Sequence, residues 1–320
     1  GGTPSLCTVD EIKKMIDGIK TVFKVADGQE ITLEANPDDI SAEKLIGWKT
    51  AGVNRLSIGI QSFFEEDLVW MNRAHSARQA IDNLQLAITH FENITIDLIY
   101  GTPDLTNEKW KKNVDAAIAL GIPHISCYAL TVEPKTPLDK MIRLRQSTAI
   151  DPDKQSEQFL LLMQWLEEAG YEHYEISNFS LPGRRSRHNA AYWAADANGK
   201  TKKYLGLGPS AHSYNGTERQ WNISNNQSYN SAIQEGTIPL EKEVLTPVQQ
   251  LNEYLMTSLR TAEGINMEVL KTAFAVGEEQ LLAKAEKFIR SGLMSQKNRS
   301  LSLTREGKLL ADGIAAELFY

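Results

Sequence analysis

The chain has 320 residues, of which 42% are hydrophobic and 23% are charged, and its formal net charge is −7. This composition is typical of a globular protein with a real core, long enough for two domains or for one barrel with an appendage. The acidic balance argues against nucleic acid as a partner. No apolar run is long enough to span a bilayer and no signal segment opens the sequence, so we expect a cytoplasmic protein.

The sequence contains only two cysteines, Cys7 and Cys127, which lie far apart. Their spacing indicates neither a disulfide framework nor a metal site, and low cysteine use fits a reducing compartment. The opening, Gly1-Gly2-Thr3-Pro4-Ser5, lacks Met and reads like a turn already under way. The two glycines are either a remnant of cloning or the turn after an earlier strand. The strand count below favours an N-terminal truncation.

Helical and extended patterns alternate through the first 130 residues. The apolar period predicts helices over residues 8–23, 41–51, 76–90 and 107–120, and strands over residues 30–35, 55–62, 94–101 and 124–130. Alternation at this spacing indicates right-handed βαβ units and a parallel sheet, either open and doubly wound or closed toward a barrel. Four strands are too few to close a barrel, which is why we expect that an earlier strand is missing.

The strands favour the barrel. Strands of an open sheet that is covered on both sides are apolar on both faces, whereas each strand here has one apolar face and one small or polar face. The polar positions are Thr32, Glu34, Ser57, Gln61, Thr95 and Asp97. This pattern suits helices outside and a partly polar interior. We therefore predict an α/β fold with a partial parallel barrel over residues 1–216, counting its extension.

The second half has a different character. A helical pattern at residues 155–169 is followed by a short extended run at 171–178 and a glycine-rich strand and turn at 204–216. We expect residues 217–245 to be a linker and residues 246–320 to form a small α+β domain. Helices and a terminal β pair at 293–296 and 300–304 give this domain a winged-helix outline. It has equal numbers of basic and acidic residues, which argues against DNA binding.

Three polar residues stand at or near the carboxyl ends of their strands, where βα barrels build their chemistry: Glu34, Gln61 and Asp97. Each alone has an ordinary explanation, as a solvated acid, a loop-capping amide or a paired acid. Arg73 is a candidate partner for Asp97 or for a ligand carboxylate. Together they predict a polar small-molecule site.

Two histidines are further candidates. His188 precedes the aromatic pair Tyr192 and Trp193, so it could ligate a haem against a flat apolar wall, although a lone histidine is more often structural. Nearby arginines could meet propionates or could simply be solvated: Arg184, Arg185 and Arg187. His212, in a glycine-rich turn, could line the barrel mouth or be an ordinary loop residue.

Several segments in chain order resemble the radical S-adenosylmethionine (radical SAM) family of oxygen-independent coproporphyrinogen III oxidases and their relatives. They are Gly1-Gly2-Thr3-Pro4-Ser5, Glu34-Ala35-Asn36-Pro37, residues 53–63, and Asp97-Leu98-Ile99-Tyr100-Gly101-Thr102-Pro103. Two later motifs, His188-Asn189-x-x-Tyr192-Trp193 and Tyr204-Leu205-Gly206-Leu207-Gly208, resemble the haem-chaperone branch of that family. The resemblance covers nearly the whole chain.

The resemblance implies a partial (βα)6-type barrel, truncated here at its N-terminus, with an added C-terminal domain. It also implies S-adenosylmethionine as cofactor and His188 as the candidate haem ligand. The implied cofactor-binding positions are Gly1, Gly2, Thr3, Glu34, Gln61, Arg73 and Asp97, with Ala129 and His212 as further contacts. The family's [4Fe–4S] cluster sits on a Cys-x3-Cys-x2-Cys motif upstream of the Gly-Gly-Thr-Pro turn, so we expect the cluster only in a full-length protein and no metal ligand in this chain.

The function that the resemblance implies first is that of a haem chaperone, which carries haem as cargo and delivers it to membrane proteins. The alternative is an oxidase that decarboxylates coproporphyrinogen III to protoporphyrinogen IX, with a porphyrinogen as substrate. Both need an electron donor, which the sequence does not identify. A third hypothesis is an inert barrel fragment without a cluster. The His-Asn-x-x-Tyr-Trp motif favours the chaperone.

Overall fold

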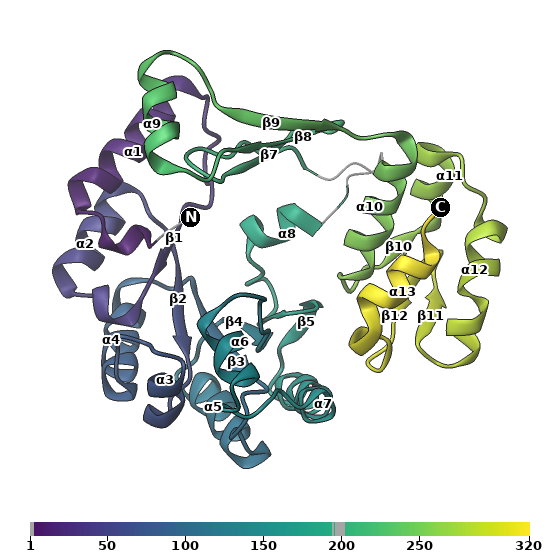
Figure 1. The fold of residues 1–320 in the computed structure, drawn as a ribbon, viewed down its shortest axis with the longest axis horizontal. Coiled ribbons are helices and arrows are strands. Elements are labelled where there is room, and N and C mark those ends of the chain that lie inside the picture. The colour runs from purple at the N-terminus through teal and green to yellow at the C-terminus, as the bar shows by residue number, and fades with distance from the viewer. Residues whose placement is uncertain (1–2, 194, 196–201) are drawn as a thin grey trace. The chain divides into compact units, whose positions relative to one another are not determined.

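The computed structural model describes residues 3–193, 195 and 202–320. The described chain divides into two compact units, Thr3–Arg187 and His188–Tyr320 (Figure 1). This division falls after Arg187, whereas the sequence suggested that the barrel and its extension reach residue 216. The first unit contains the α/β sheet, and the second contains two smaller sheets with their helices.

A six-stranded sheet in the order β1-β2-β3-β4-β6-β5 forms the first unit. Its strands are β1 (Thr32–Ala35), β2 (Arg55–Gln61), β3 (Ile94–Tyr100), β4 (His124–Ala129), β5 (Glu172–Glu175) and β6 (Asn178–Ser180). The first four are parallel, as predicted, whereas β6 runs antiparallel to β4 and β5 antiparallel to β6. Only two residues separate β5 from β6, too few for the crossover that a parallel pair needs.

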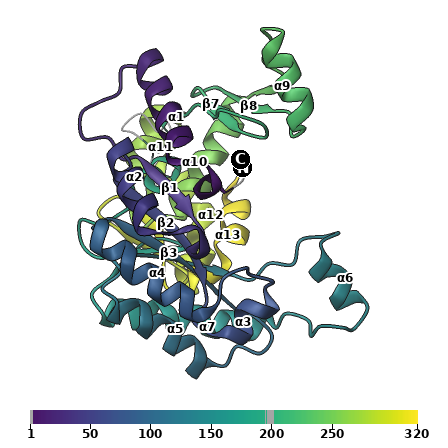
Figure 2. The same cartoon turned by 90° about the vertical axis from the view of Figure 1, so that its left-hand side faces the viewer.

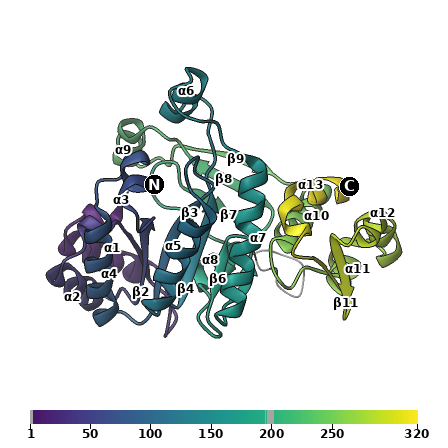
Figure 3. The same ribbon diagram turned by 90° about the horizontal axis from the view of Figure 1, so that it is seen from below.

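Helices cover one face of this sheet (Figures 1 and 3). They are α1 (Val9–Val22), α2 (Ala42–Ala51), α4 (Ala77–His90), α5 (Asn107–Ala119) and α7 (Pro152–Glu168). Thr8 and Glu11 form the predicted capping box at the start of α1. Between the helices and the sheet lies the core, which includes the fully buried Leu56, Ile58, Ile96 and Leu98. Burying each such side chain contributes about 2 kcal/mol, so the apolar strand face anchors the sheet to its helices.

Shorter helices occupy the connections of the first unit. These are the 3-10 turns η1 (Pro4–Leu6) and η2 (Pro37–Asp39), and the helices α3 (Glu65–Trp70) and α6 (Pro137–Arg143). Helix α6 has no buried residue and stands away from the sheet (Figure 2). It belongs to a long connection that follows β4, at the same edge of the sheet as the carboxyl ends of β1–β4.

The second unit begins with α8, whose bounds are Arg187–Trp193, and continues into an antiparallel sheet in the order β7-β8-β9. Its strands are β7 (His212–Tyr214), β8 (Glu218–Asn222) and β9 (Leu240–Val244), with α9 (Asn226–Gln234) between the last two. Residues 217–245, which we expected to be a linker, therefore contain two strands and a helix. Their alternation is weak because β9 is exposed along its whole length, so it leaves no apolar stripe in the sequence.

The C-terminal part of the second unit has the winged-helix outline that the sequence predicts. Its elements are α10 (Pro247–Leu259), β10 (Ile265–Asn266), α11 (Met267–Phe274), α12 (Glu278–Arg290), β11 (Met294–Lys297), β12 (Ser300–Leu303), η3 (Gly307–Leu310) and α13 (Ala311–Leu318). The strands form a small antiparallel sheet in the order β10-β12-β11. Fully buried Leu255, Leu281 and Leu318 join three of the helices to one core.

Candidate cofactor site on the polar face of the sheet

The face of the sheet opposite the helices is polar, and the strand register lines its side chains up in rows. In one row Glu34 pairs with Ser57, Ser57 with Thr95, and Thr95 with His124. The next row toward the carboxyl ends contains Asp97, followed by Ser126 and Asn178. Because side chains alternate along a strand, the apolar residues between these positions all face the helices.

A buried network of hydrogen bonds lies at the amino-terminal side of this polar face. Arg55, 1% exposed, donates to the Thr95 hydroxyl, which also contacts His124 Nδ1 at 3.1 Å. On its other side the His124 ring contacts the hydroxyl of Tyr174, with 2.8 Å between Nε2 and the oxygen. Burial lowers the pKa of Arg55 and takes the pKa of His124 well below its ordinary value. The neutral imidazole therefore links β3 to β5, and Arg55 places a buried cation beneath this face.

Strand β2 ends in a backbone irregularity at Gln61. The register between β2 and β3 shifts between Ile58 and Gln61, and Gln61 has φ of +67°, in the left-handed region. Arg73 reaches the same place: its Nη2 donates to Asn36 Oδ1 at 2.9 Å and to the Gly59 carbonyl at 3.2 Å. A Cβ placed on Gly59 would lie 2.9 Å from Gln61 Nε2 and 3.4 Å from Arg73 Nη2. The amide of Gln61 and the guanidinium of Arg73 thus converge over Gly59.

Asp97 lies within the electrostatic reach of this cluster. Burial, reinforced by the charge of Glu34, raises its pKa to about 7, although Ser126, Arg73 and Arg55 act in the opposite direction. The structure therefore brings together the four side chains that the sequence singled out at the strand ends: Glu34, Gln61, Arg73 and Asp97.

The other expected cofactor contacts are placed differently. Thr3 precedes η1, and Ala129 is an exposed residue at the end of β4, paired with Tyr100. Gly1 and Gly2 lie outside the described residues. His212 belongs to the second unit, where it is exposed at the start of β7 and its ring lies 6.3 Å from that of Trp221.

His188 is exposed on α8 of the second unit. The rings of His188 and Tyr192, one turn apart, meet edge to face with 5.1 Å between their centroids. The Tyr192 ring lies another 5.1 Å from that of Tyr204. On the same helix Trp193 Nε1 donates to Asn189 Oδ1 at 3.2 Å. The His-Asn-x-x-Tyr-Trp motif is therefore a short helical segment that presents an imidazole beside an aromatic ring.

Two of the three arginines near His188 have partners in the first unit. Arg185 Nε is 3.2 Å from Glu172 Oε2, and its guanidinium stacks over Tyr174. Arg187 donates to the carbonyl of Gly28 at 2.7 Å. These contacts favour a structural role for both over the solvated or propionate-binding roles considered from the sequence. Arg184 is exposed.

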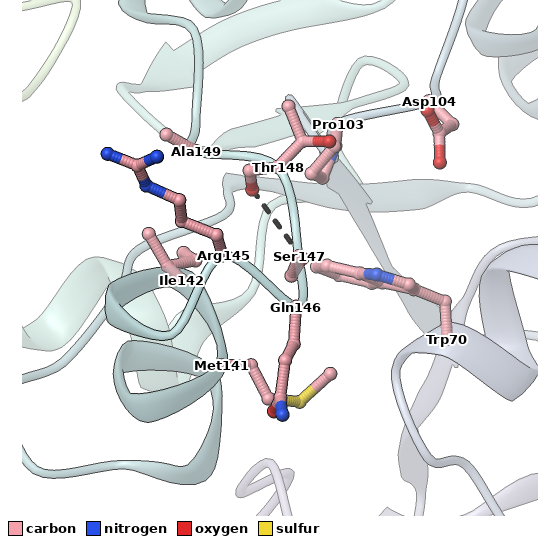
Figure 4. A pocket seen from close by; sticks show the side chains of 10 residues that line it. All are labelled: Trp70, Pro103, Asp104, Met141, Ile142, Arg145, Gln146, Ser147, Thr148 and Ala149. Carbon is pink, nitrogen blue, oxygen red and sulfur yellow. Dashed lines mark hydrogen bonds between the residues drawn. The ribbon is translucent and has the colours of Figure 1, made fainter.

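A cavity of about 610 Å³ lies beside α6, between connections that follow β2, β3 and β4 (Figure 4). The indole of Trp70 extends across it toward Ser147, with Pro103 on one wall and Met141 on another (Figure 4). Arg145 and Asp104 add opposite charges to its lining. The cavity has the size and mixed lining of a small-molecule site, and its walls follow the carboxyl ends of the strands.

Sequence reasoning missed Asn36, Gly59 and His75. Asn36 orients Arg73, Gly59 leaves room for the Gln61 amide, and His75 Nε2 contacts the Ile60 carbonyl at 3.1 Å. Asn36 and Gly59 fall inside motifs that the sequence analysis quoted, but without side-chain contacts nothing marked them. His75 lies two residues after Arg73 in an irregular connection, where no period assigns it a direction.

The donor set fits S-adenosylmethionine. Arg73 Nε is buried and has no hydrogen-bond partner among the described residues, so a donor remains for a ligand carboxylate. Glu34 and Asp97 are suited to the cationic end of the same ligand. The set does not fit an iron–sulfur cluster, because such a cluster needs several cysteine thiolates. Cys127 is fully buried with a strongly raised pKa, and the described residues contain no group of three metal-ligating side chains.

Family models and curated relatives match most of the chain. Residues 1–117 match the radical SAM superfamily, and residues 245–310 match the HemN C-terminal domain. The Heme chaperone HemW of Bacillus subtilis is 32% identical over 318 residues, which cover 98% of this chain and 82% of the relative. The chain belongs to the HemW family. The Mycobacterium tuberculosis HemW (strain H37Rv) is also 32% identical, over 99% of this chain and 79% of that protein.

A solved structure matches the fold of the whole chain. Coproporphyrinogen III oxidase (HemN) from Escherichia coli matches with a TM-score of 0.83 at 20% identity, over all of this chain and 76% of that one. The predicted radical SAM fold with an added C-terminal domain is therefore confirmed, and that domain is of the HemN type. Membership of the radical SAM superfamily implies S-adenosylmethionine and a [4Fe–4S] cluster. In the part of the chain that the structure describes, no helix is long and apolar enough to cross a membrane.

Proposed function

We propose that this chain is a haem chaperone of the radical SAM type, which holds S-adenosylmethionine at the rim of Glu34, Gln61, Arg73 and Asp97 and binds haem through His188. The observation that carries the proposal is the similarity to proteins named Heme chaperone HemW along 98% of this chain, which takes in the His188 helix. Transfer of haem to membrane proteins belongs to the same proposal, and the family resemblance is its support.

Electrostatics supports the cofactor part of the proposal. Burial raises the pKa of Asp97, and the charge of Glu34 adds to that effect. A ligand with an ammonium and a sulfonium group offsets the negative charge of these acids, while the Arg73 Nε–H, which has no partner among the described residues, donates to the ligand's carboxylate. Bound beside a cluster, S-adenosylmethionine supplies one-electron chemistry, and the protein's part is to orient it and exclude water.

Local geometry supports the haem part. The imidazole of His188 is exposed and could serve as an axial ligand. Tyr192, 39% exposed and edge-on to His188, offers a flat apolar surface beside that ligand. This ligation uses no cysteine of the chain.

The experiment is a haem titration followed by the absorbance of the bound haem, with wild-type chain, His188→Ala and His90→Ala as a matched control. We expect stoichiometric binding by the wild type and by His90→Ala, and at least tenfold weaker binding by His188→Ala. Equal affinity in all three would remove His188 from the site. Binding of S-adenosylmethionine, measured in parallel, should be the same for the three proteins.

A second assay separates the chaperone from the oxidase hypothesis. Full-length protein with its cluster reconstituted is incubated with coproporphyrinogen III, S-adenosylmethionine and a chemical reductant. The chaperone proposal expects haem binding without formation of protoporphyrinogen IX. Catalytic turnover to that product would replace it with the oxidase.

A further inference from the structure

The backbone before Gln61 is held by side chains from the connection that follows α3. The carbonyl of Gly59 accepts from Arg73 Nη2 at 3.2 Å, and the carbonyl of Ile60 accepts from His75 Nε2 at 3.1 Å. These are the two peptide groups that precede Gln61, at the point where the register between β2 and β3 shifts. The Ile60 carbonyl also accepts from the Ser62 amide at 2.9 Å, across Gln61. Side chains thus anchor the strand end where regular pairing is interrupted.

The His75 contact has a defined polarity. A carbonyl oxygen only accepts, so Nε2 carries the hydrogen and His75 is the donor. The side chain is 1% exposed, and burial lowers its pKa, so the ring is neutral near pH 7. Its Nδ1 faces Asp38 Oδ1 at 3.9 Å, beyond hydrogen-bond distance, and the charges of Arg73 and Glu65 act on it from nearby. His75 has one short polar contact at this site, the one to Ile60.

We infer that His75 is a positioning residue that holds the left-handed backbone of Gln61, so that the Gln61 amide faces the bound S-adenosylmethionine. A residue other than glycine in this region of backbone space is strained, and it persists where its neighbours determine its conformation. His75 constrains the peptide before Gln61. The inference rests on the proposed cofactor role of the rim.

A second anchor restrains the other side of Gln61. The Ser62 hydroxyl donates to Asp67 Oδ2 at 2.7 Å, and the Phe63 amide donates to Asn113 Oδ1 at 2.7 Å. Side-chain contacts therefore hold the backbone on both sides of Gln61: those of Arg73 and His75 before it, and those of Ser62 and Phe63 after it. Loss of the His75 contact loosens the side before Gln61, where Arg73 still donates to the Gly59 carbonyl, while the contacts of Ser62 and Phe63 hold the other side.

The test compares His75→Ala and His75→Gln with wild type in the 320-residue chain. S-adenosylmethionine affinity is measured by titration calorimetry, and amide hydrogen exchange is followed in a peptide that contains residues 59–62. We expect His75→Ala to weaken affinity by up to roughly tenfold, because the Ile60 carbonyl then keeps only the Ser62 amide as a donor, and to speed exchange in that peptide. His75→Gln, whose amide nitrogen can donate to the same carbonyl, should recover most of both effects.

Leu84→Ala is the matched control for general destabilisation. Leu84 is fully buried on α4, in the same βα unit, and its loss should lower the melting temperature without changing the affinity. If Leu84→Ala weakens binding as much as His75→Ala at equal loss of stability, or if His75→Ala binds like wild type, the inference is wrong. Gln61→Ala distinguishes failure of the His75 inference from failure of the proposed cofactor site. Unchanged affinity of Gln61→Ala for S-adenosylmethionine would contradict the cofactor role of the rim itself.

Discussion

The amide of Gln61 occupies the space that a side chain at Gly59 would need, since a Cβ on Gly59 would lie 2.9 Å from Gln61 Nε2. The positions are two apart on β2, so their side chains point to the same face of the sheet. Gly59 is therefore required by packing at the rim and not by its own backbone, which lies outside the left-handed region. Glycine here makes room for the group that would touch the cofactor.

Gly59→Ala should separate binding from stability. The atom that must move is the far end of a flexible side chain, so we expect the free energy of unfolding to change by about 1 kcal/mol or less. Displacing the amide should weaken S-adenosylmethionine binding by roughly tenfold, the cost of about one buried hydrogen bond. Titration calorimetry and urea unfolding measure the two effects. Gly18→Ala, on the exposed side of α1 with open space around it, is the control and should leave affinity unchanged.

Asp97 should make stability depend on pH in an unusual direction for an acid. Its pKa in the folded chain is about 7, against an ordinary value of 3.8, so the folded state binds more protons between these values. Its favourable contribution is complete below about pH 4 and is lost as pH rises through about 7. Asp97→Asn should therefore become more stable relative to wild type between pH 4 and 8, by about 4 kcal/mol at most. Urea unfolding at several pH values measures this, and a constant difference would contradict it.

Gly307 should be indispensable to the C-terminal domain. A Cβ at this position would lie 1.9 Å from the backbone oxygen of Leu293, an atom that no side-chain rotation can move away. We expect Gly307→Ala to lower the free energy of unfolding by about 3 kcal/mol. Gly313→Ala, in the exposed face of α13 with open space around it, should instead stabilise by about 0.5–1 kcal/mol. Thermal unfolding compares them, and equal melting temperatures would exclude the clash.

The 320-residue chain should not hold an iron–sulfur cluster. Cys127 is fully buried with a strongly raised pKa, so its thiol resists the deprotonation that iron ligation needs. Cys7 alone cannot replace a set of ligands. Anaerobic reconstitution with iron and sulfide, followed by gel filtration and visible absorbance, should leave no cluster on the protein. A stable cluster band that survives filtration would show that the ligand analysis is wrong.

The periodicity of the first 130 residues was enough to place β1 to β4 and four of the helices that cover them. Apolar residues alternate there at the strand period or recur at the helix period, because one side of every element is buried. Periodicity could not show that β6 runs antiparallel to β4 and β5 antiparallel to β6. In the sequence, two short strands joined by two residues look like one interrupted strand. It also missed β8 and β9, where the burial that creates a pattern is absent.

At the candidate site, residue type and strand position sufficed to select Glu34, Gln61 and Asp97, because the carboxyl ends of parallel strands share an edge. The burial, charge environment and conformation of those side chains depend on the tertiary structure. The raised pKa of Asp97 comes from burial, reinforced by Glu34, and the peptide groups before Gln61 receive hydrogen bonds from Arg73 and His75. Such effects arise between residues distant in the chain, and local patterns carry no information about those distances.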